Sequence, residues 1–187
     1  MEESLRKLLD HREKQYIVDS KRIPSAVLVP IYLWDEDYHI IFIRRTETVK
    51  EHKGQISFPG GICEKEDKST MDTALRESHE EIGLLAEDVE VLGELDDEIT
   101  TTSNYIVSPF VGIIQWPYRF TKSEDEVDEI LKVPLPALLD KDCPRPDTEI
   151  LNGKEVDSYA YNYRGTIIWG ATARILYKLL DIIKQAN

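Results

Sequence analysis

Three glutamates of this chain, Glu77, Glu80 and Glu81, stand at a spacing that brings their carboxylates together if the segment is helical. Residues three and four apart are neighbours on a helix surface, and each pair of like charges there destabilises a helix by about 0.2–0.5 kcal/mol. A hard divalent cation would offset this repulsion, because Mg²⁺ and Mn²⁺ prefer oxygen ligands and bridge well to phosphate groups. An acidic face that contacts only solvent is the alternative, and spacing alone leaves both interpretations open.

The segment between Ser69 and Gly83 carries the signals of one short helix. Ser69 is followed three residues later by Asp72, which predicts a capped start with acidic charge in the first turn. Gly83 predicts the end, because glycine readily adopts the conformation that terminates helices. We expect Arg76 and the three glutamates on the flanking and opposite faces of this helix. Apolar or small residues at helical spacing predict its buried stripe: Met71, Ala74, Leu75, Ser78 and Ile82.

The run Arg76-Glu77-x-x-Glu80-Glu81-x-Gly83-Leu84, preceded by Gly60-Gly61, resembles the Nudix box of the Nudix hydrolases. The match has one departure. Gly61 stands one residue further from Arg76 than the generic box places it, and Lys68, with Asp67 beside it, occupies the position of the middle glutamate of the box. One inserted loop residue accounts for both differences.

A second run, upstream of the box, looks like the additional signature of the coenzyme A pyrophosphatase branch of that family. Its matching residues are Arg45-Thr46, Lys50, His52, Gly54 and the run from Gln55 to Gly61. Lys50 stands where the branch usually has Arg, and it keeps the positive charge without the bidentate fork. The loop of residues 46–54 is therefore expected to hold a nucleotide phosphate, with a solvated loop as the alternative.

The resemblance implies metal-dependent hydrolysis of the pyrophosphate bond of coenzyme A or its derivatives, giving 3′,5′-ADP and 4′-phosphopantetheine. Nudix hydrolases often take a further glutamate from outside the box, as metal ligand or as base, and Glu126 is the best match here. The implied catalytic residues are Arg76, Glu77, Glu81 and Glu126. The implied ligands of Mg²⁺ or Mn²⁺ are Glu77, Glu80, Glu81 and the carbonyl group of Gly60. The implied substrate contacts are Arg45, Lys50, His52 and Gly61.

Two alternatives stay open. Within the enzyme class, the substrate could be ADP-ribose, a dinucleotide or a nucleoside triphosphate. From a different class comes a catalytically silent Nudix module that binds a nucleotide as a sensor. The intact Arg76-Glu77-x-x-Glu80-Glu81 disfavours the silent module, because a pure binding module has no need of three clustered carboxylates.

The elements that must position these residues can also be predicted. An amphipathic helix is expected at about residues 3–16, and strands are expected over residues 25–34, 39–45, 89–95 and 105–115, the last interrupted by Pro109. Residues 140–158 indicate an irregular loop leading into a hairpin, and an apolar stripe from Ile175 to Ile183 predicts a final helix. Resemblance to Nudix proteins then implies an α/β/α sandwich around a mixed β-sheet. The strand order cannot be derived from the sequence.

Three further polar or aromatic features have a structural interpretation beside a functional one. Glu98 could reach the metal, but we expect a solvated carboxylate. His79 occupies a variable position of the box and is expected to be an exposed helix residue. Tyr159, Tyr161 and Tyr163 alternate along a predicted strand, and such a ladder belongs more often to a core than to a binding surface.

Length and composition limit the remaining possibilities. The 187 residues, 41% hydrophobic and 32% charged, suit one globular domain spanning residues 1–187. A net charge of −13 disfavours nonspecific binding to nucleic acid or to an anionic membrane. The small nucleotide substrate that the resemblance implies is anionic, so local cations or a bound metal must attract it. The sequence is compatible with a homodimer without determining the oligomeric state.

The two cysteines and the apolar runs predict the cellular compartment. Cys63 and Cys143 form neither a Cys-x-x-Cys pair nor a disulfide framework, which indicates free thiols in a reducing compartment. No secretory signal is visible after Met1, and no apolar run approaches the roughly 18 residues of a membrane span. A cytoplasmic protein is the expectation.

Overall fold

The computed structural model describes residues 1–48, 53–151 and 154–186, and its centre is the long strand β1 (Ile23–Trp34). β1 pairs in antiparallel fashion with β2 (Asp37–Arg45) and β4 (Gly60–Ile62), and in parallel with β7 (Tyr105–Ile114). The sheet is therefore mixed. Further antiparallel strands extend it on both sides: β3 (Ile56–Ser57) and β8 (Val127–Pro134) on β2, and β5 (Val89–Glu94) and β6 (Glu98–Ile99) on β7.

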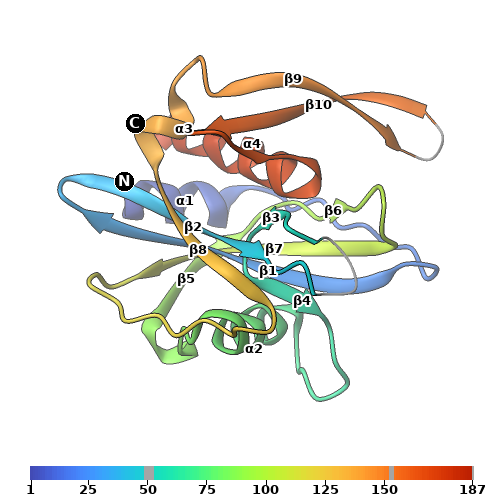
Figure 1. Ribbon diagram of the computed structural model, residues 1–187, viewed down its shortest axis with the longest axis horizontal. Helices are drawn as coiled ribbons and strands as arrows, with labels where there is room; N and C mark the ends of the chain where they lie inside the picture. The colour runs from blue at the N-terminus through green and yellow to red at the C-terminus, as the bar shows by residue number, and fades with distance from the viewer. Residues whose placement is uncertain (49–52, 152–153, 187) are drawn as a thin grey trace.

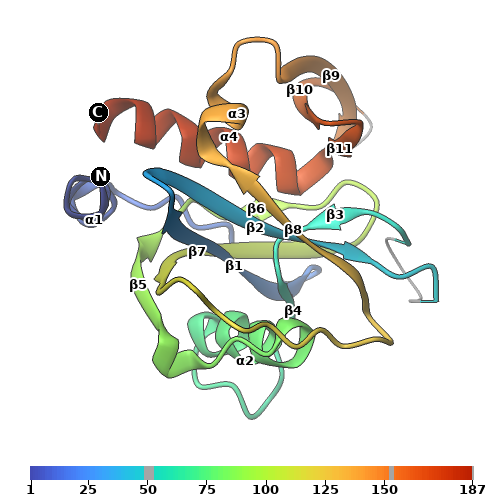
Figure 2. The same ribbon diagram turned by 60° about the vertical axis from the view of Figure 1, so that its left-hand side comes forward.

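Helices cover both faces of this sheet. α2 (Thr70–Ile82) lies on one face, while α1 (Glu2–His11) and α4 (Gly170–Ala186) lie on the other, as Figures 1 and 2 show. Successive strand residues point to opposite faces, so Leu28 and Ile41 pack toward α2, whereas Val29 and Phe42 pack toward α1 and α4. The expected α/β/α sandwich around a mixed sheet is confirmed. The short helices are η1 (Ala86–Asp88) and α3 (Leu135–Leu139).

A second sheet lies on the outer side of α4 and differs from the expectation for residues 140–158. It consists of β9 (Pro144–Leu151), β10 (Lys154–Tyr163) and β11 (Thr166–Ile168), with β10 in the middle (Figure 1). The prediction of an irregular loop over Pro144–Leu151 was wrong, because β9 is an edge strand of this sheet and an edge strand tolerates prolines. Of the tyrosine ladder on β10, Tyr161 is buried, whereas the half-exposed Tyr159 stacks on Tyr177 of α4 with 4.5 Å between ring centroids.

Two element boundaries also differ from the predictions. α1 ends at His11 rather than at residue 16, because the following segment is extended and Lys14 pairs with Glu94 at the end of β5 and with Asp97 beyond it. β7 is continuous through Pro109, which lies between the stretch paired with β6 and the stretch paired with β5. Because Pro109 lies between the two paired stretches, its missing N–H costs no hydrogen bond in the pairing of β7 with β5 or with β6. The carbonyl group of Pro109 accepts from Leu95 N–H at 2.9 Å.

Helix α2 begins and ends as predicted. The hydroxyl of Ser69 accepts a hydrogen bond from Asp72 N–H at 3.2 Å, and Gly83 ends the helix in the left-handed conformation at φ 68°. Ala74, Ser78 and Ile82 are buried as expected. The buried stripe does not include Met71, which is 37% exposed at the first turn of the helix.

Two chain-wide expectations can be compared with the structure. Cys63 and Cys143 are free thiols, as their spacing predicts. Within the part of the chain that the structure describes, no helix combines the length and the apolar composition needed to cross a membrane.

Candidate active site

Glu81 is the most deeply placed carboxylate of α2, and only 1% of its surface is exposed. The expectation that it lies on an outer face of the helix was wrong, because α2 packs against β1 and β4 with Glu81 turned toward the strands. One carboxylate oxygen accepts from Gly60 N–H at 2.9 Å, and the other accepts from Arg45 Nη1 at 3.1 Å. Helical spacing alone could not show which side of the acidic cluster faces the sheet.

Burial raises the pKa of Glu81 to about 8. The hydrogen bond from Gly60 and the charge of Arg45 oppose this rise, while the carboxylates of Glu77 and Glu126 add to it. Burial likewise raises the pKa of Glu77, against the hydrogen bond from Arg76. Burial is the main cause of both shifts, and the neighbouring carboxylates add to them.

Gly61 provides the space that the Glu77 carboxylate occupies. A Cβ atom on residue 61 would lie 2.4 Å from Cδ of Glu77, closer than any real contact. Glycine at this position is therefore required for Glu77 to approach the strand β4. At Gly60, a Cβ atom would lie 2.3 Å from the carbonyl oxygen of Ala26, and φ is 156°, so this position also requires glycine.

Arg76 holds two of the glutamates on the outer side of the cluster. Its Nη1 donates to Glu77 Oε1 at 2.8 Å and to Glu80 Oε2 at 3.0 Å. Its Nε and Nη2 donate to the two oxygens of Asp67 at 3.0 and 3.1 Å, which holds the pKa of that carboxyl well below its usual range. Sequence analysis did not identify Asp67 as this partner, although its position beside the displaced box residue was the available signal.

Arg45 and Ser57 carry polar atoms that are buried but unused. Arg45 Nε and Ser57 Oγ have no hydrogen-bond partner among the described residues. Buried polar atoms of this kind are rare in folded proteins unless something outside the chain satisfies them. Both residues line the same cleft as Glu77 and Glu81. Ser57 falls within the upstream signature, but sequence analysis gave it no role of its own.

Glu126 lies across the cleft from α2, in the turn that precedes β8. Its side chain is exposed, and its backbone carbonyl accepts from Thr46 N–H at 3.0 Å. Ser123 N–H donates to the Glu81 carbonyl at 2.9 Å, which anchors this turn to the end of α2. The structure therefore brings Glu126 to the same end of the cleft as Glu77 and Glu81.

The cleft has a volume of about 750 Å³, within the range of small-molecule sites. It runs from the carboxylates past β3 and β4 to the loop of Thr100–Thr102 and the start of α4 at residues 169–172. Thr48, within the predicted phosphate loop, and Gln55, directly after it, line the cleft as well. Lys50 and His52 lie outside the described residues.

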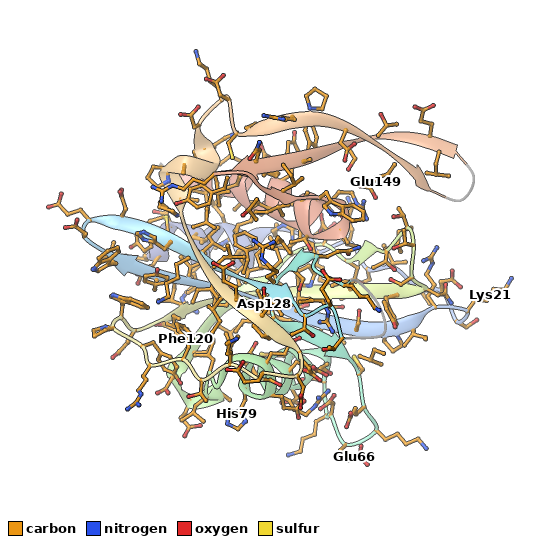
Figure 3. All side chains as sticks on the ribbon, in the orientation of Figure 1. Lys21, Glu66, His79, Phe120, Asp128 and Glu149 are labelled. Atoms are coloured by element: carbon orange, nitrogen blue, oxygen red, sulfur yellow. The ribbon has the colours of Figure 1, made fainter. Side chains whose placement is uncertain are left out.

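Two residues discussed from the sequence are not in the cleft. Glu98 is neither solvated nor beside the carboxylate cluster, because it is buried and pairs with Arg174 Nε at 3.0 Å and Lys178 Nζ at 2.8 Å. Its cationic partners follow it by more than seventy residues, so no local pattern could reveal them. His79 is exposed and points away from α2 (Figure 3).

The donor set suits a hard divalent cation, although the side chains are not gathered as ligands. In the described part of the chain, no three His, Cys, Asp or Glu side chains are grouped closely enough to hold a metal ion as they stand. The glutamates of α2 nevertheless offer only oxygen donors, and Glu77, Glu80 and Glu81 share Arg45 and Arg76 as their cations. The half-exposed Glu80 side chain has room to turn toward its neighbours.

Sequence comparison finds one domain family and several relatives. Residues 24–151 match the NUDIX domain. A protein from Photorhabdus laumondii, named as an uncharacterized Nudix hydrolase NudL, is 34% identical over 160 residues, covering 86% of this chain and 84% of its own. A protein of the same name from Pectobacterium atrosepticum is 36% identical over 155 residues, covering 83% and 80%.

Solved structures share the fold at low sequence identity. A MutT/nudix family protein from Enterococcus faecalis has a TM-score of 0.61 at 16% identity, covering 94% of this chain and 66% of its own. The NUDIX domain of Shewanella oneidensis NrtR, complexed with ADP ribose, has a TM-score of 0.52 at 16% identity, covering 65% and 81%. At these identities the likeness concerns the fold alone.

Proposed function

The chain belongs to the Nudix family, and from this premise we propose that it hydrolyses the pyrophosphate bond of coenzyme A or a coenzyme A derivative. One observation carries the proposal. Buried Glu81, between Gly60 N–H and Arg45, faces Glu77 and Glu126 at one end of a cleft large enough for a nucleotide derivative. Perturbed carboxylates in a cleft are the usual mark of a catalytic site.

Glu77, Glu80 and Glu81 would hold Mg²⁺ or Mn²⁺ together with the Gly60 carbonyl group. Such an ion supplies neutralisation of the diphosphate charge and a lower pKa for the attacking water. Arg76 keeps Glu77 and Glu80 oriented through its shared Nη1, and Asp67 keeps Arg76 in place. Positioning and charge neutralisation account for most of the catalysis in phosphoryl transfer.

The hydrolysis itself needs a base and a cation at the phosphate. Water attacks one phosphorus atom, the bridging P–O bond breaks, and Glu126 or a glutamate of α2 accepts the water proton. Arg45, which keeps Nη1 on Glu81, would supply positive charge to a phosphate at this end of the cleft. The products are 3′,5′-ADP and 4′-phosphopantetheine.

The choice of coenzyme A rests on the upstream signature and on the unused polar atoms within it. Arg45 and Ser57 both belong to that signature, and both reach the cleft. A different nucleoside diphosphate derivative would use the same carboxylates with other contacts around them. A silent binding module would keep the cleft without turnover.

The test is incubation with coenzyme A and Mg²⁺ or Mn²⁺, beside ADP-ribose, NADH and nucleoside triphosphates, with products identified by mass. We expect release of 3′,5′-ADP from coenzyme A well ahead of the other substrates. Cleavage of another substrate alone would overturn the choice of coenzyme A and leave the hydrolase assignment intact. Absence of any cleavage would favour the binding module.

A further inference from the structure

The far end of the cleft differs in chemistry from the carboxylate end. We define it as the distal wall, made of Thr100–Thr102 and residues 169–172. The charged residues among the described lining residues are the acids Glu64, Glu77, Glu81, Asp125 and Glu126 and the cation Arg45. None of them belongs to the distal wall, which instead offers threonine hydroxyls, backbone groups and the indole of Trp169.

Trp169 is the largest side chain of the distal wall and is 37% exposed. An aromatic ring left partly open inside a cleft gains apolar contact when a ligand covers it. Thr101 and Thr172 are half-buried beside it in the wall. The Thr101 hydroxyl donates its proton to Glu149 and can still accept from an amide or hydroxyl group of a ligand, and the Thr172 hydroxyl can hydrogen-bond such groups as well. Neither supplies charge for a phosphate.

A buried ion-pair unit fixes the position of this wall. Arg174, in the second turn of α4, pairs with Glu98 of β6 and Glu149 of β9, and its Nη2 donates to the carbonyl group of Ile99. Glu149 in turn accepts from the hydroxyl of Thr101 at 3.2 Å. Figure 3 shows Glu149 on the β9–β10 hairpin. The loop carrying Thr101 and the start of α4 are therefore tied to the same arginine.

Part of the distal wall lies outside the matched NUDIX domain. That match ends at residue 151, whereas residues 169–172 and Arg174 follow it. The carboxylate end falls wholly within the match. The distal wall thus combines a loop of the matched domain with residues that follow it, and its neutral lining restricts what it can recognise.

We propose that the distal wall binds the neutral arm of the substrate, a flexible chain of amide and hydroxyl groups of the pantetheine type, with Trp169 and Thr101 as its specificity residues. This inference rests on the proposed function and adds the orientation of the substrate in the cleft. The arm extends from the diphosphate toward α4, and the nucleotide half occupies the Arg45 side. Arg174 is a positioning residue that acts through Thr101.

Product binding tests the inference without turnover. Titration calorimetry measures 4′-phosphopantetheine and 3′,5′-ADP separately, in Mg²⁺, against the native protein and the variants Thr101→Val and Trp169→Ala. We expect 4′-phosphopantetheine to bind about 5-fold more weakly to Thr101→Val and about 10-fold more weakly to Trp169→Ala, from one lost hydrogen bond and one lost aromatic contact. Binding of 3′,5′-ADP should change less than about 2-fold.

The matched control is Thr148→Val, at an exposed threonine of β9 that does not line the cleft. It should bind both products as the native protein does. Weaker binding of 3′,5′-ADP in the distal-wall variants, or unchanged binding of both products, would overturn the inference while coenzyme A hydrolysis by the native protein still supported the proposed function. A native protein that binds 4′-phosphopantetheine without hydrolysing coenzyme A would support the role of the distal wall and overturn the proposed function. A native protein that neither binds 4′-phosphopantetheine nor hydrolyses coenzyme A would overturn both.

Discussion

Acidic residues gather in two regions of this molecule, and the two regions balance their charge differently. At the carboxylate end of the cleft, burial and mutual repulsion raise the pKa values of Glu77 and Glu81 despite Arg45 and Arg76. Around the start of α4, Glu98 and Glu149 meet Arg174 and Lys178, and nearby Asp96 meets Arg12. Burial works against ionisation there too, but hydrogen bonds from Ser158 and Arg174 lower the pKa of Glu149.

The difference separates structural charge from functional charge. Where each buried carboxylate has a cation, the ion pairs hold elements together and need nothing further. Where carboxylates outnumber cations, the folded protein keeps an unfavourable charge that a ligand can relieve. The sequence runs Glu77-x-x-Glu80-Glu81 and Glu94-x-Asp96-Asp97-Glu98 are both acidic. The resemblance to the box marks the first run, and the structure shows that cations pair with the second.

The largest effect is expected from removing a cation from the region around the start of α4, where carboxylates and cations are paired. Arg174→Met leaves Glu98 and Glu149 buried with one cation fewer, which should lower the free energy of unfolding by about 3–5 kcal/mol. Urea unfolding measures this loss, and Arg145→Met, at an exposed position of β9, is the control. A loss no greater than that of the control would show that the ion pairs do not hold this region.

At the carboxylate end of the cleft, a substitution should change catalytic activity rather than the free energy of unfolding. Glu81→Gln should lower kcat/KM for coenzyme A more than about 100-fold, since even outer partners of a metal site are worth about 10–100-fold. The control Glu87→Gln, on the exposed η1 turn, should keep native activity. Normal turnover by Glu81→Gln would remove the glutamates of α2 from the mechanism.

The boundaries of α2 could be predicted because Ser69 and Gly83 are local signals, whereas the orientation of its glutamates could not. Burial of Glu81 depends on how the helix packs on β4, which helical spacing does not encode. The ion pair between Glu98 and Arg174 joins residues from distant parts of the chain. The sequence around Glu98 therefore could not show that its carboxylate is paired rather than solvated. The cleft itself was predicted only at its carboxylate end, where a motif marks it.

The pH dependence of stability should sharpen the contrast further. The pKa of Glu81 is raised to about 8 in the folded state, above its ordinary 4.5. Stability is therefore greatest below pH 4.5 as far as this group is concerned, and it is lost as the pH rises through 8. Metal-free native protein should lose about 1–3 kcal/mol between pH 5 and pH 8.

Urea unfolding at the two pH values measures this loss, with Glu81→Gln as the matched variant. Glutamine carries no titratable proton, so most of the slope should disappear in the variant. An equal change in the free energy of unfolding with pH in both proteins would show that ionisation of Glu81 does not destabilise the fold.

The smallest of these effects is expected at Gly61. Gly61→Ala places a methyl group where the Glu77 carboxylate lies, and no left-handed backbone adds strain. The displaced carboxylate should lower kcat/KM about 10-fold, while the free energy of unfolding changes by less than about 1 kcal/mol. Kinetics and urea unfolding on the same variant check both statements, and a loss of stability without a loss of activity would contradict the assigned role of Glu77.

The central claim is that the surplus carboxylates form a divalent cation site, and Mn²⁺ titration tests it most directly. Calorimetry at pH 7.5, repeated in two buffers of different ionisation enthalpy, reports both the affinity and the protons released. The native protein should bind Mn²⁺ with release of a proton, because the ion displaces the proton that Glu81 retains, and Glu81→Gln should bind far more weakly without that release. Equal binding by the two proteins, or binding with no proton released, would contradict the claim.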